Sequence, residues 1–233
     1  MVIDPPAAAR RESSFFGRRK GKTLRAYQAG LMETLLPNVR VDLSAPVANP
    51  SALFSGAPDD LRLEVGFGGG EHLAADALSN PGRGYIGCEP FVNGVAKLMA
   101  QIAAQDLRNI RVHPGDAGDM IDALPAASLS GACILYADPW PKRRHRERRF
   151  VSDQMLTRLA RVMRSGAELR FASDIDDYVG WTLARILRSP DFVWPAQSEA
   201  EWLAPWPEWS GTRYEAKALL EGRRPVYLTF IRR

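Results

Sequence analysis

Gly66, Gly68 and Gly70 follow a strand-like run and precede a helical one, an arrangement that lets the backbone approach a ligand closely. Glu64 lies just before this turn. A carboxylate there would repel a pyrophosphate but attract the ammonium group of an amino-acid tail. The spacing is Gly-x-Gly-x-Gly, and Glu71 stands where the dinucleotide pattern Gly-x-Gly-x-x-Gly has its third glycine. The turn therefore predicts S-adenosylmethionine, which carries an amino-acid tail and no phosphate, rather than a nicotinamide dinucleotide.

Three more carboxylates lie at or near the ends of the strands predicted to follow. Glu89 can accept hydrogen bonds from both ribose hydroxyls of the cofactor, and Asp116 can accept one from the adenine amino group. Asp138 ends the next strand. Each acid could instead be a turn or cap residue, but four in register at successive strand ends favour a ligand site. The residues expected to contact the cofactor are Glu64, Gly66, Gly68, Gly70, Glu89, Asp116 and Asp138.

Basic residues gather in two blocks, which indicates a polyanionic partner. One block lies in the run DPWPKRRHRERR at 138–149. Its guanidinium groups can bind phosphates while Asp138 faces a base, and Trp140 either stacks on a base or packs the loop. The other block lies in residues 1–25 and is either an electrostatic clamp on nucleic acid or a solvated surface. Its members are Arg10, Arg11, Arg18, Arg19, Lys20, Lys22 and Arg25.

Alternating strands and helices must position these residues. The pattern predicts an α/β fold: a Rossmann-like, doubly wound, mostly parallel seven-stranded sheet with an antiparallel C-terminal strand, in three α/β/α layers. Residues 1–50 are expected to be a basic, partly disordered arm with a short helix at 24–36, and residues 51–233 the methyl-donor-binding domain. The strands expected are 61–67, 84–90, 110–116, 131–139, 167–174, 191–194 and 225–232, and the main helices 71–80, 91–105, 152–164 and 176–189.

Composition excludes several other classes of protein. The chain has 233 residues, 45% of them hydrophobic, and a net charge of +4, which suits one domain with an appendage. No apolar run approaches the ~20 residues of a membrane span, and the N-terminus lacks the apolar core of a secretory signal, so a cytoplasmic location is expected. Cys88 and Cys133 lie in apolar runs and are expected to be inert buried thiols. With three histidines and two cysteines, no zinc-type spacing can be assembled, so no metal is expected.

The chain resembles the bacterial tRNA (guanine-N7)-methyltransferases from about residue 61 to 231. The resemblance rests on the segments LEVGFGGGEHL (63–73), GCEPF (87–91), DPWPKRRHRERR (138–149), ASDIDDY (172–178) and GTRYEAKALLEGRRPVYLTF (211–230). Two positions depart from the family pattern: Ala137 stands where the family often has Pro, and Thr-Arg-Tyr-Glu stands at 212–215 where it often has Thr-Lys-Phe-Glu. Both changes keep charge or aromatic character and leave the implied function intact.

The resemblance implies a role for each matching residue. Asp138 would be the catalytic acid between cofactor and guanine, with Lys142 and Asp174 contacting the substrate. The late segment Thr212, Arg213, Tyr214 and Glu215 would form a loop that closes over the guanine. The residues implied to contact RNA are Arg144, His145, Arg146, Arg148 and Arg149. The implied substrate is tRNA, methylated at a variable-loop guanine to give 7-methylguanosine, and the enzyme would be a monomer or a homodimer.

Guanine N7 carries a free lone pair, so direct transfer from a sulfonium needs no nucleophilic residue, no metal and no prior removal of a proton. Asp138 or Asp174 can therefore orient the base and stabilise developing positive charge, a role that we favour over general-base catalysis. Glu215 is expected to need a partner that guanine can supply. Three other hypotheses remain at this point: a nicotinamide-dependent oxidoreductase, a non-catalytic RNA-binding module, and a methyltransferase for another RNA or for a protein.

Overall fold

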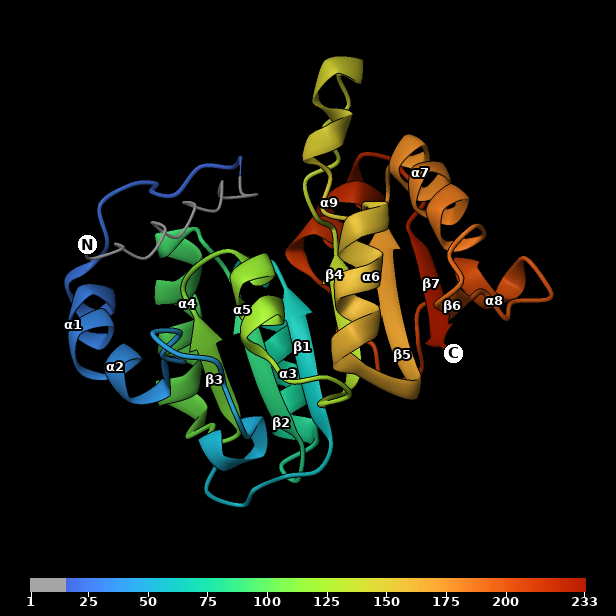
Figure 1. The fold of residues 1–233 in the computed structure, drawn as a ribbon. Helices are drawn as coiled ribbons and strands as arrows, with labels where there is room; N and C mark the ends of the chain where they lie inside the picture. Colours follow the sequence, from blue (N-terminus) through green and yellow to red (C-terminus); the bar gives the residue numbers. More distant parts are fainter. Residues whose placement is uncertain (1–15) are drawn as a thin grey trace, which may run out of the picture.

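A computed structural model describes residues 16–233, in which seven strands form one sheet of order β3-β2-β1-β4-β5-β7-β6 (Figure 1). The first five strands are parallel, and β7 runs antiparallel to both β5 and β6. This confirms the predicted doubly wound sheet with its antiparallel C-terminal strand. The strands are β1 (Leu61–Val65), β2 (Gly84–Cys88), β3 (Ile110–His113), β4 (Leu129–Leu135), β5 (Met163–Ser173), β6 (Phe192–Val193) and β7 (Val226–Arg232).

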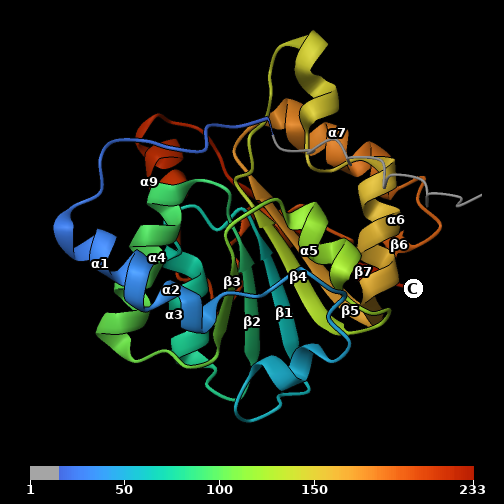
Figure 2. The same cartoon turned by 60° about the vertical axis from the view of Figure 1, so that its left-hand side comes forward.

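Helices cover both faces of the sheet, giving three layers (Figures 1 and 2). One face carries α3 (Glu71–Ser79) and α4 (Val92–Gln105), whose apolar residues pack with Ile110 and Val112 of β3. The other face carries α5 (Ala117–Ala123), α6 (Asp153–Val162) and α7 (Asp176–Ile186), which bury a larger apolar cluster against β1, β4 and β5. Because both faces are covered, the central strands are buried on both sides, as parallel strands usually are.

The segment expected to be a mobile arm is partly built into the fold. Residues 1–15, with Arg10 and Arg11, lie outside the described residues. Residues 16–25 run without regular structure across the edge where the parallel strands end (Figure 2). They are held on α4, since the Arg19 carbonyl accepts from the amide of Val92 (2.9 Å) and the amide of Gly21 donates to Asn93 Oδ1 (2.7 Å).

The helix expected at 24–36 is divided into α1 (Ala26–Thr34) and α2 (Leu36–Val39), and α1 packs against α4. Ser152 caps α6 as its position predicts, by accepting from the amide of Met155. The helix ends at Val162, four residues short of Gly166. Gly166 therefore does not cap α6; it lies inside β5 with a φ of 80°, where the β4–β5 register shifts.

Short helical elements complete the chain: η1 (Pro50–Leu53), η2 (Arg143–Arg148), α8 (Ala200–Leu203) and α9 (Arg213–Leu220). The late segment was expected to be a loop, but its residues start α9. Thr212 and Glu215 form a reciprocal capping box there, which fixes the first turn of a helix. Among the described residues, no helix combines the length and apolarity that crossing a membrane requires.

Candidate active site

A cleft of about 460 Å³ opens beyond the carboxyl ends of β1, β2, β3 and β4. Its walls include the first turns of α5 and α6 and the N-terminal residues 16–18. Small-molecule sites have volumes of about 300–1,000 Å³, so the cleft can hold a nucleoside-sized cofactor. The predicted site residues that line it are Gly66, Gly68, Glu89, Asp116, Asp138, Arg148, Arg149, Arg213 and Tyr214.

The glycine turn adopts a backbone that only glycine takes at little cost. Gly66, Gly68 and Gly70 have φ values of 68°, 57° and 79°. The amide of Gly66 donates to the carbonyl of Cys88 (2.8 Å), so the turn crosses from β1 to the end of β2. Gly94 of α4 packs so closely below it that a Cβ there would lie 2.1 Å from the Gly68 carbonyl oxygen. The turn and the start of α4 therefore form one rigid floor for the cleft.

Glu89 and Asp116 enter this cleft from the ends of β2 and β3. The buried Glu89 carboxylate accepts from the amides of Gly68 (2.7 Å) and Phe91 (2.9 Å). Burial raises the pKa of Glu89, and the two backbone hydrogen bonds offset only part of that rise. Asp116 caps α5 through the amide of Gly118 (2.8 Å). A carboxylate offers about four acceptor sites, so Glu89 can keep both bonds and still accept from a ligand.

Asp138 lies on a strained turn three residues beyond β4. Tyr136 and Trp140, on either side of it, have φ values of 51° and 42°, in the left-handed region that non-glycine residues rarely occupy. Such strain costs about 1–3 kcal/mol per residue and gathers at functional sites, where the surrounding fold imposes it. The Asp138 carboxylate is open to the cleft, and desolvation by the surrounding protein raises its pKa. The structure thus holds an acid with a raised pKa at the end of the fourth strand.

Arg149 was expected to contact RNA, but the structure buries it beneath the turn. Its side chain donates to the carbonyl of Pro139 (2.7 Å) and pairs with the carboxylate of Asp177 in α7. Arg146 pairs with the same carboxylate (2.6 Å). A buried guanidinium has to satisfy its donors inside the protein, so Arg149 anchors the Asp138 turn and leaves no donor group on the surface for phosphate.

Arg148 is the other basic residue of this segment that lines the cleft. The guanidinium of Arg148 lies over the rings of both Phe16 and Trp140, at 5.0 and 5.2 Å from their centroids. Trp140 therefore packs against Arg148, with Phe16 meeting its ring edge to face. The remaining basic residues of this segment are exposed or half-buried: Lys142, Arg143, Arg144, His145 and Arg146.

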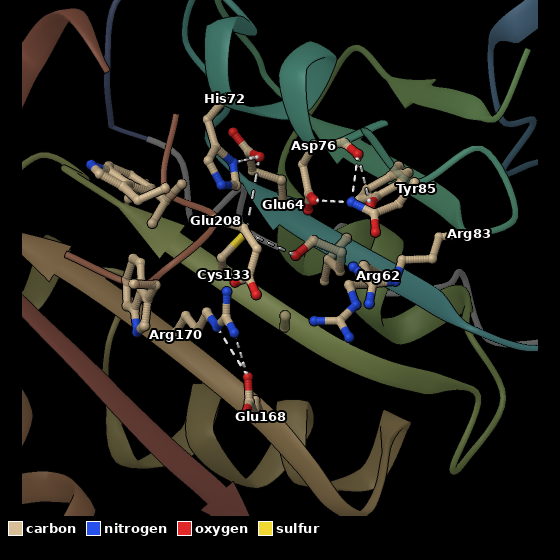
Figure 3. A pocket seen from close by; sticks show the side chains of 16 residues that line it. Arg62, Glu64, His72, Asp76, Arg83, Tyr85, Cys133, Glu168, Arg170 and Glu208 are labelled. Carbon is tan, nitrogen blue, oxygen red and sulfur yellow. Dashed lines mark hydrogen bonds and ion pairs between the residues drawn. The ribbon is translucent and has the colours of Figure 1, made fainter. Parts of the chain in front are cut away.

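Glu64 is not among the carboxylates that line this cleft, although all four acids were expected to share one site. Leu61, Leu63 and Val65 of β1 pack into the core under α5–α7, so the alternation of the strand turns Glu64 to the opposite face. There its carboxylate bonds to Nδ1 of His72 (2.7 Å) in a second, smaller pocket (Figure 3). This bond joins β1 to the first turn of α3.

Glu215 was expected to need guanine as a partner, but its partners lie within the chain. The buried carboxylate accepts from the indole of Trp209 (2.8 Å), from the amide of Thr212 (3.3 Å) and from the hydroxyl of Tyr227. The tryptophans of residues 200–211 include two, at 206 and 209, that pack on the ring of Tyr227. This cluster fixes the start of α9 against β7.

Arg213 and Tyr214 are the residues of α9 that reach the cleft. Arg213 donates to the Tyr214 hydroxyl (3.1 Å), and both side chains lie over Gly68. Asp174 lies elsewhere, in an ion pair with Arg223 at 2.5 Å, and does not line the cleft. Of the predicted substrate contacts, Arg213 and Tyr214 therefore lie at the glycine turn, whereas Asp174 is paired with Arg223.

Known proteins that resemble this chain identify its family. Residues 59–228 match the family described as "Putative methyltransferase". The chain is 51% identical to the tRNA (guanine-N(7)-)-methyltransferase of Nitrobacter hamburgensis, over 98% of this chain and 91% of that protein. It is also 51% identical to the enzyme of the same name from Mesorhizobium japonicum, over 97% of both. The chain belongs to the tRNA (guanine-N7)-methyltransferase family.

Solved structures share the fold at much lower identity. The 16S rRNA methyltransferase KamB superposes with a TM-score of 0.52 at 20% identity, over 76% of this chain and 89% of that one. A methyltransferase from Streptococcus mutans in complex with SAH gives 0.50 at 7% identity, over 76% and 90%. At these identities the likeness shows a common fold and nothing further about activity.

Sequence reasoning missed two residues that shape the cleft of this family member. Gly94 carried a signal, because a glycine inside a helical pattern costs about 1 kcal/mol relative to alanine and therefore often has a packing reason. Phe16 carried none, since it belongs to a short Phe-Phe pair in a basic arm that shows no periodicity. Its contacts depend on how the arm returns across the sheet edge, which local pattern does not encode.

Proposed function

We propose that this chain transfers the methyl group of S-adenosylmethionine to N7 of a guanine in tRNA. The chain belongs to the family of enzymes with this activity, and one observation supports the roles that we propose for its residues. Carboxylates from the ends of three successive strands, Glu89, Asp116 and Asp138, line one cleft, to which the arginine-rich η2 segment contributes Arg148. The cofactor supplies an electrophilic methyl group, and the chain supplies its binding, the alignment of the base and the electrostatic field.

The cofactor half of the cleft fits a nucleoside with an amino-acid tail. Glu89 accepts from the ribose hydroxyls, and Asp116 accepts from the adenine amino group. The positive-φ backbone at Gly66 and Gly68 leaves room for the tail to lie against the turn. Glu64 acts on this half indirectly, through its hydrogen bond to the first turn of α3.

Asp138 faces the guanine in this proposal. Its carboxylate accepts from the N1–H and the exocyclic amino group, a donor pair that adenine lacks. Alignment of the N7 lone pair with the methyl group supplies about 7–11 kcal/mol of the acceleration. As the base becomes cationic, the Asp138 charge stabilises the transition state. The chain therefore needs no general base and no metal ion in the transfer step.

The exposed part of η2 binds the tRNA backbone. Lys142 and Arg144 present charge beside the cleft, and the described part of the arm, residues 16–25, runs along the same edge (Figure 2). We also propose a variable-loop guanine as the target, a division into the arm 1–50 and the catalytic unit 51–233, a cytoplasmic location, and a monomer or a homodimer.

The test incubates the purified protein with unmodified tRNA and labelled methyl donor, then digests the RNA and identifies the nucleosides. We expect 7-methylguanosine from the wild type and none from Asp138→Ala, which should still bind tRNA. Another labelled nucleoside would overturn the choice of atom. Binding of tRNA without any transfer by the wild type would favour a non-catalytic RNA-binding protein.

A further inference from the structure

Tyr136 belongs both to the cleft and to the aromatic cluster that fixes the start of α9. It lines the cleft together with Asp138, which lies two residues further along the same turn. It also packs against the buried residues Leu135, Ala172 and Tyr227. The turn beyond β4 and the cluster beneath α9 therefore meet at this tyrosine.

The backbone at Tyr136 is strained in a way that permits this double contact. Consecutive residues of an extended strand point to opposite faces of a sheet. Leu135 and Tyr136 are consecutive, yet both pack in the same cluster. The chain achieves this with a φ of 51° at Tyr136, in the left-handed region that a bulky residue rarely occupies. The amide of Tyr136 donates to the carbonyl of Ala172 in β5 (2.8 Å), so the turned residue stays attached to the sheet.

The hydroxyl of Tyr136 is buried, but it completes no hydrogen bond of good geometry with the described residues. The hydroxyl of Tyr227 lies next to it, and the carboxylates of Glu215 and Asp174 lie nearby. Burial and these neighbours raise the pKa of Tyr136, so its hydroxyl stays protonated and remains a donor. Buried tyrosine hydroxyls usually have a partner, so a bond that is not made here requires an explanation.

An acceptor for this donor is already in place. The Tyr227 hydroxyl donates to Glu215 Oε1 and keeps its own lone pairs for a donor on its other side. Glu215 belongs to the capping box that starts α9, and the first turn of this helix carries Arg213 and Tyr214 into the cleft. A hydrogen bond from Tyr136 to Tyr227 would therefore join two walls of the cleft, the turn beyond β4 and the start of α9.

We propose that Tyr136 is a positioning residue for methyl transfer: when the cleft closes on cofactor and guanine, its hydroxyl donates to Tyr227 and fixes the Asp138 turn to the start of α9. The bond is not made in the free protein and forms in the closed complex, so it stabilises the arrangement in which transfer occurs. The hydroxyl itself touches neither the cofactor nor the base. The inference rests on the proposed function and deepens it, because it states how two walls of the same cleft are held together.

The test is Tyr136→Phe, which removes the hydroxyl and keeps the ring. A bond that is made only on the way to the transition state affects kcat and leaves KM unchanged. One neutral hydrogen bond corresponds to about 3–10-fold, so single-turnover methyl transfer at saturating tRNA and cofactor should slow by that factor. The melting temperature should stay the same or rise, because the hydroxyl makes no bond in the free protein.

Two further variants serve as matched controls. The hydroxyl of Tyr85 in β2 donates to the carbonyl of Asp76 (3.2 Å), and neither residue lines the cleft. Tyr85→Phe should therefore show the opposite pattern, a lower melting temperature with the wild-type rate of transfer. Tyr227→Phe removes the proposed acceptor, so in that background Tyr136→Phe should change the rate by less than about twofold.

The inference is wrong if Tyr136→Phe transfers methyl groups at the wild-type rate, or if it raises the KM for tRNA at an unchanged kcat. It is also wrong if the melting temperature falls together with the rate, or if the loss of rate is as large in the Tyr227→Phe background. A wild type that transfers no methyl group to tRNA guanine would refute the proposed function, and this inference with it. An active wild type matched by an equally active Tyr136→Phe would refute this inference alone.

Discussion

Replacing Arg149 by methionine separates a structural arginine from its RNA-binding neighbours. The side chain is fully buried and donates to the Pro139 carbonyl at 2.7 Å and to the Asp177 carboxylate. An unpaired buried charge would cost about 3–5 kcal/mol, but Asp177 is half exposed and keeps Arg146. The loss is then that of hydrogen bonds from a charged donor, about 2 kcal/mol. For a chain of this length we expect the melting temperature to fall by about 4–8 °C.

Catalysis should suffer more than stability in Arg149→Met. The lost bond to Pro139 held the turn on which Asp138 lies, and a displacement of the order of 1 Å at a reacting group costs roughly 100-fold. The affinity for tRNA and its dependence on salt should stay unchanged, because the buried guanidinium touches no phosphate. Thermal unfolding, single-turnover methyl transfer and tRNA binding at several salt concentrations measure the three quantities.

Arg144→Met is the matched control, since it removes the same charge from an exposed position in η2. Its melting temperature should stay within about 2 °C of the wild type, as for most surface substitutions. The slope of log affinity against log salt should fall by roughly 0.7–0.9, the contribution of one phosphate contact. If Arg149→Met lowered this slope while melting normally, its assignment as the anchor of the turn would be refuted.

Three further predictions follow from the site. Burial raises the pKa of Asp138, so kcat/KM should fall with decreasing pH at a midpoint above its ordinary 3.8. A carboxyl group whose pKa is raised on folding adds stability as it is protonated, so the protein should stay folded at the pH where activity falls. If Asp138→Asn showed the same fall of kcat/KM at acid pH, Asp138 would not be the group responsible. Gly94→Ala should destabilise by about 1–3 kcal/mol, because its Cβ would meet the Gly68 carbonyl. Gly30→Ala, a helical control with open space around it, should stabilise by up to about 1 kcal/mol, and equal effects would refute the contact. In Glu215→Gln the amide cannot accept from all three donors, so the free energy of unfolding should fall by about 1–3 kcal/mol. Normal melting with weaker tRNA binding would instead indicate that Glu215 contacts the substrate.

The order and type of the main elements followed from the periodicity of apolar residues and from the turn and cap residues between them. Gly66 to Gly70 marked the first strand-to-helix turn, and Ser152 marked the start of α6, because cap and turn residues act locally. The short helix α5 was not predicted, since its seven residues give too little periodicity to detect. The loop expected at 212–215 came from the family resemblance, whereas the capping box of Thr212 and Glu215 starts a helix of eight residues there.

The basic segment shows what composition does not determine. Arg144 and Arg149 belong to one run of arginines, yet the first is exposed and the second is buried. The difference comes from Asp177, which α7 brings beneath the turn from 28 residues further along the chain. A run of charges predicts a polyanion partner for the run as a whole, and tertiary pairing decides which members remain available to it.

The four carboxylates divide by their positions relative to the observed ends of their strands. Residues inside a strand alternate between faces, whereas residues beyond its end are placed by the turn that follows. Glu64 precedes the last residue of β1, so Leu63 and Val65 in the core require it to point to the other face. Glu89, Asp116 and Asp138 lie one, three and three residues beyond Cys88, His113 and Leu135, which end their strands. Only these three are free of the alternation, and they are the three that meet in the cleft. The strands predicted at 61–67, 84–90, 110–116 and 131–139 contain all four acids, so only the observed strand ends separate Glu64 from the others.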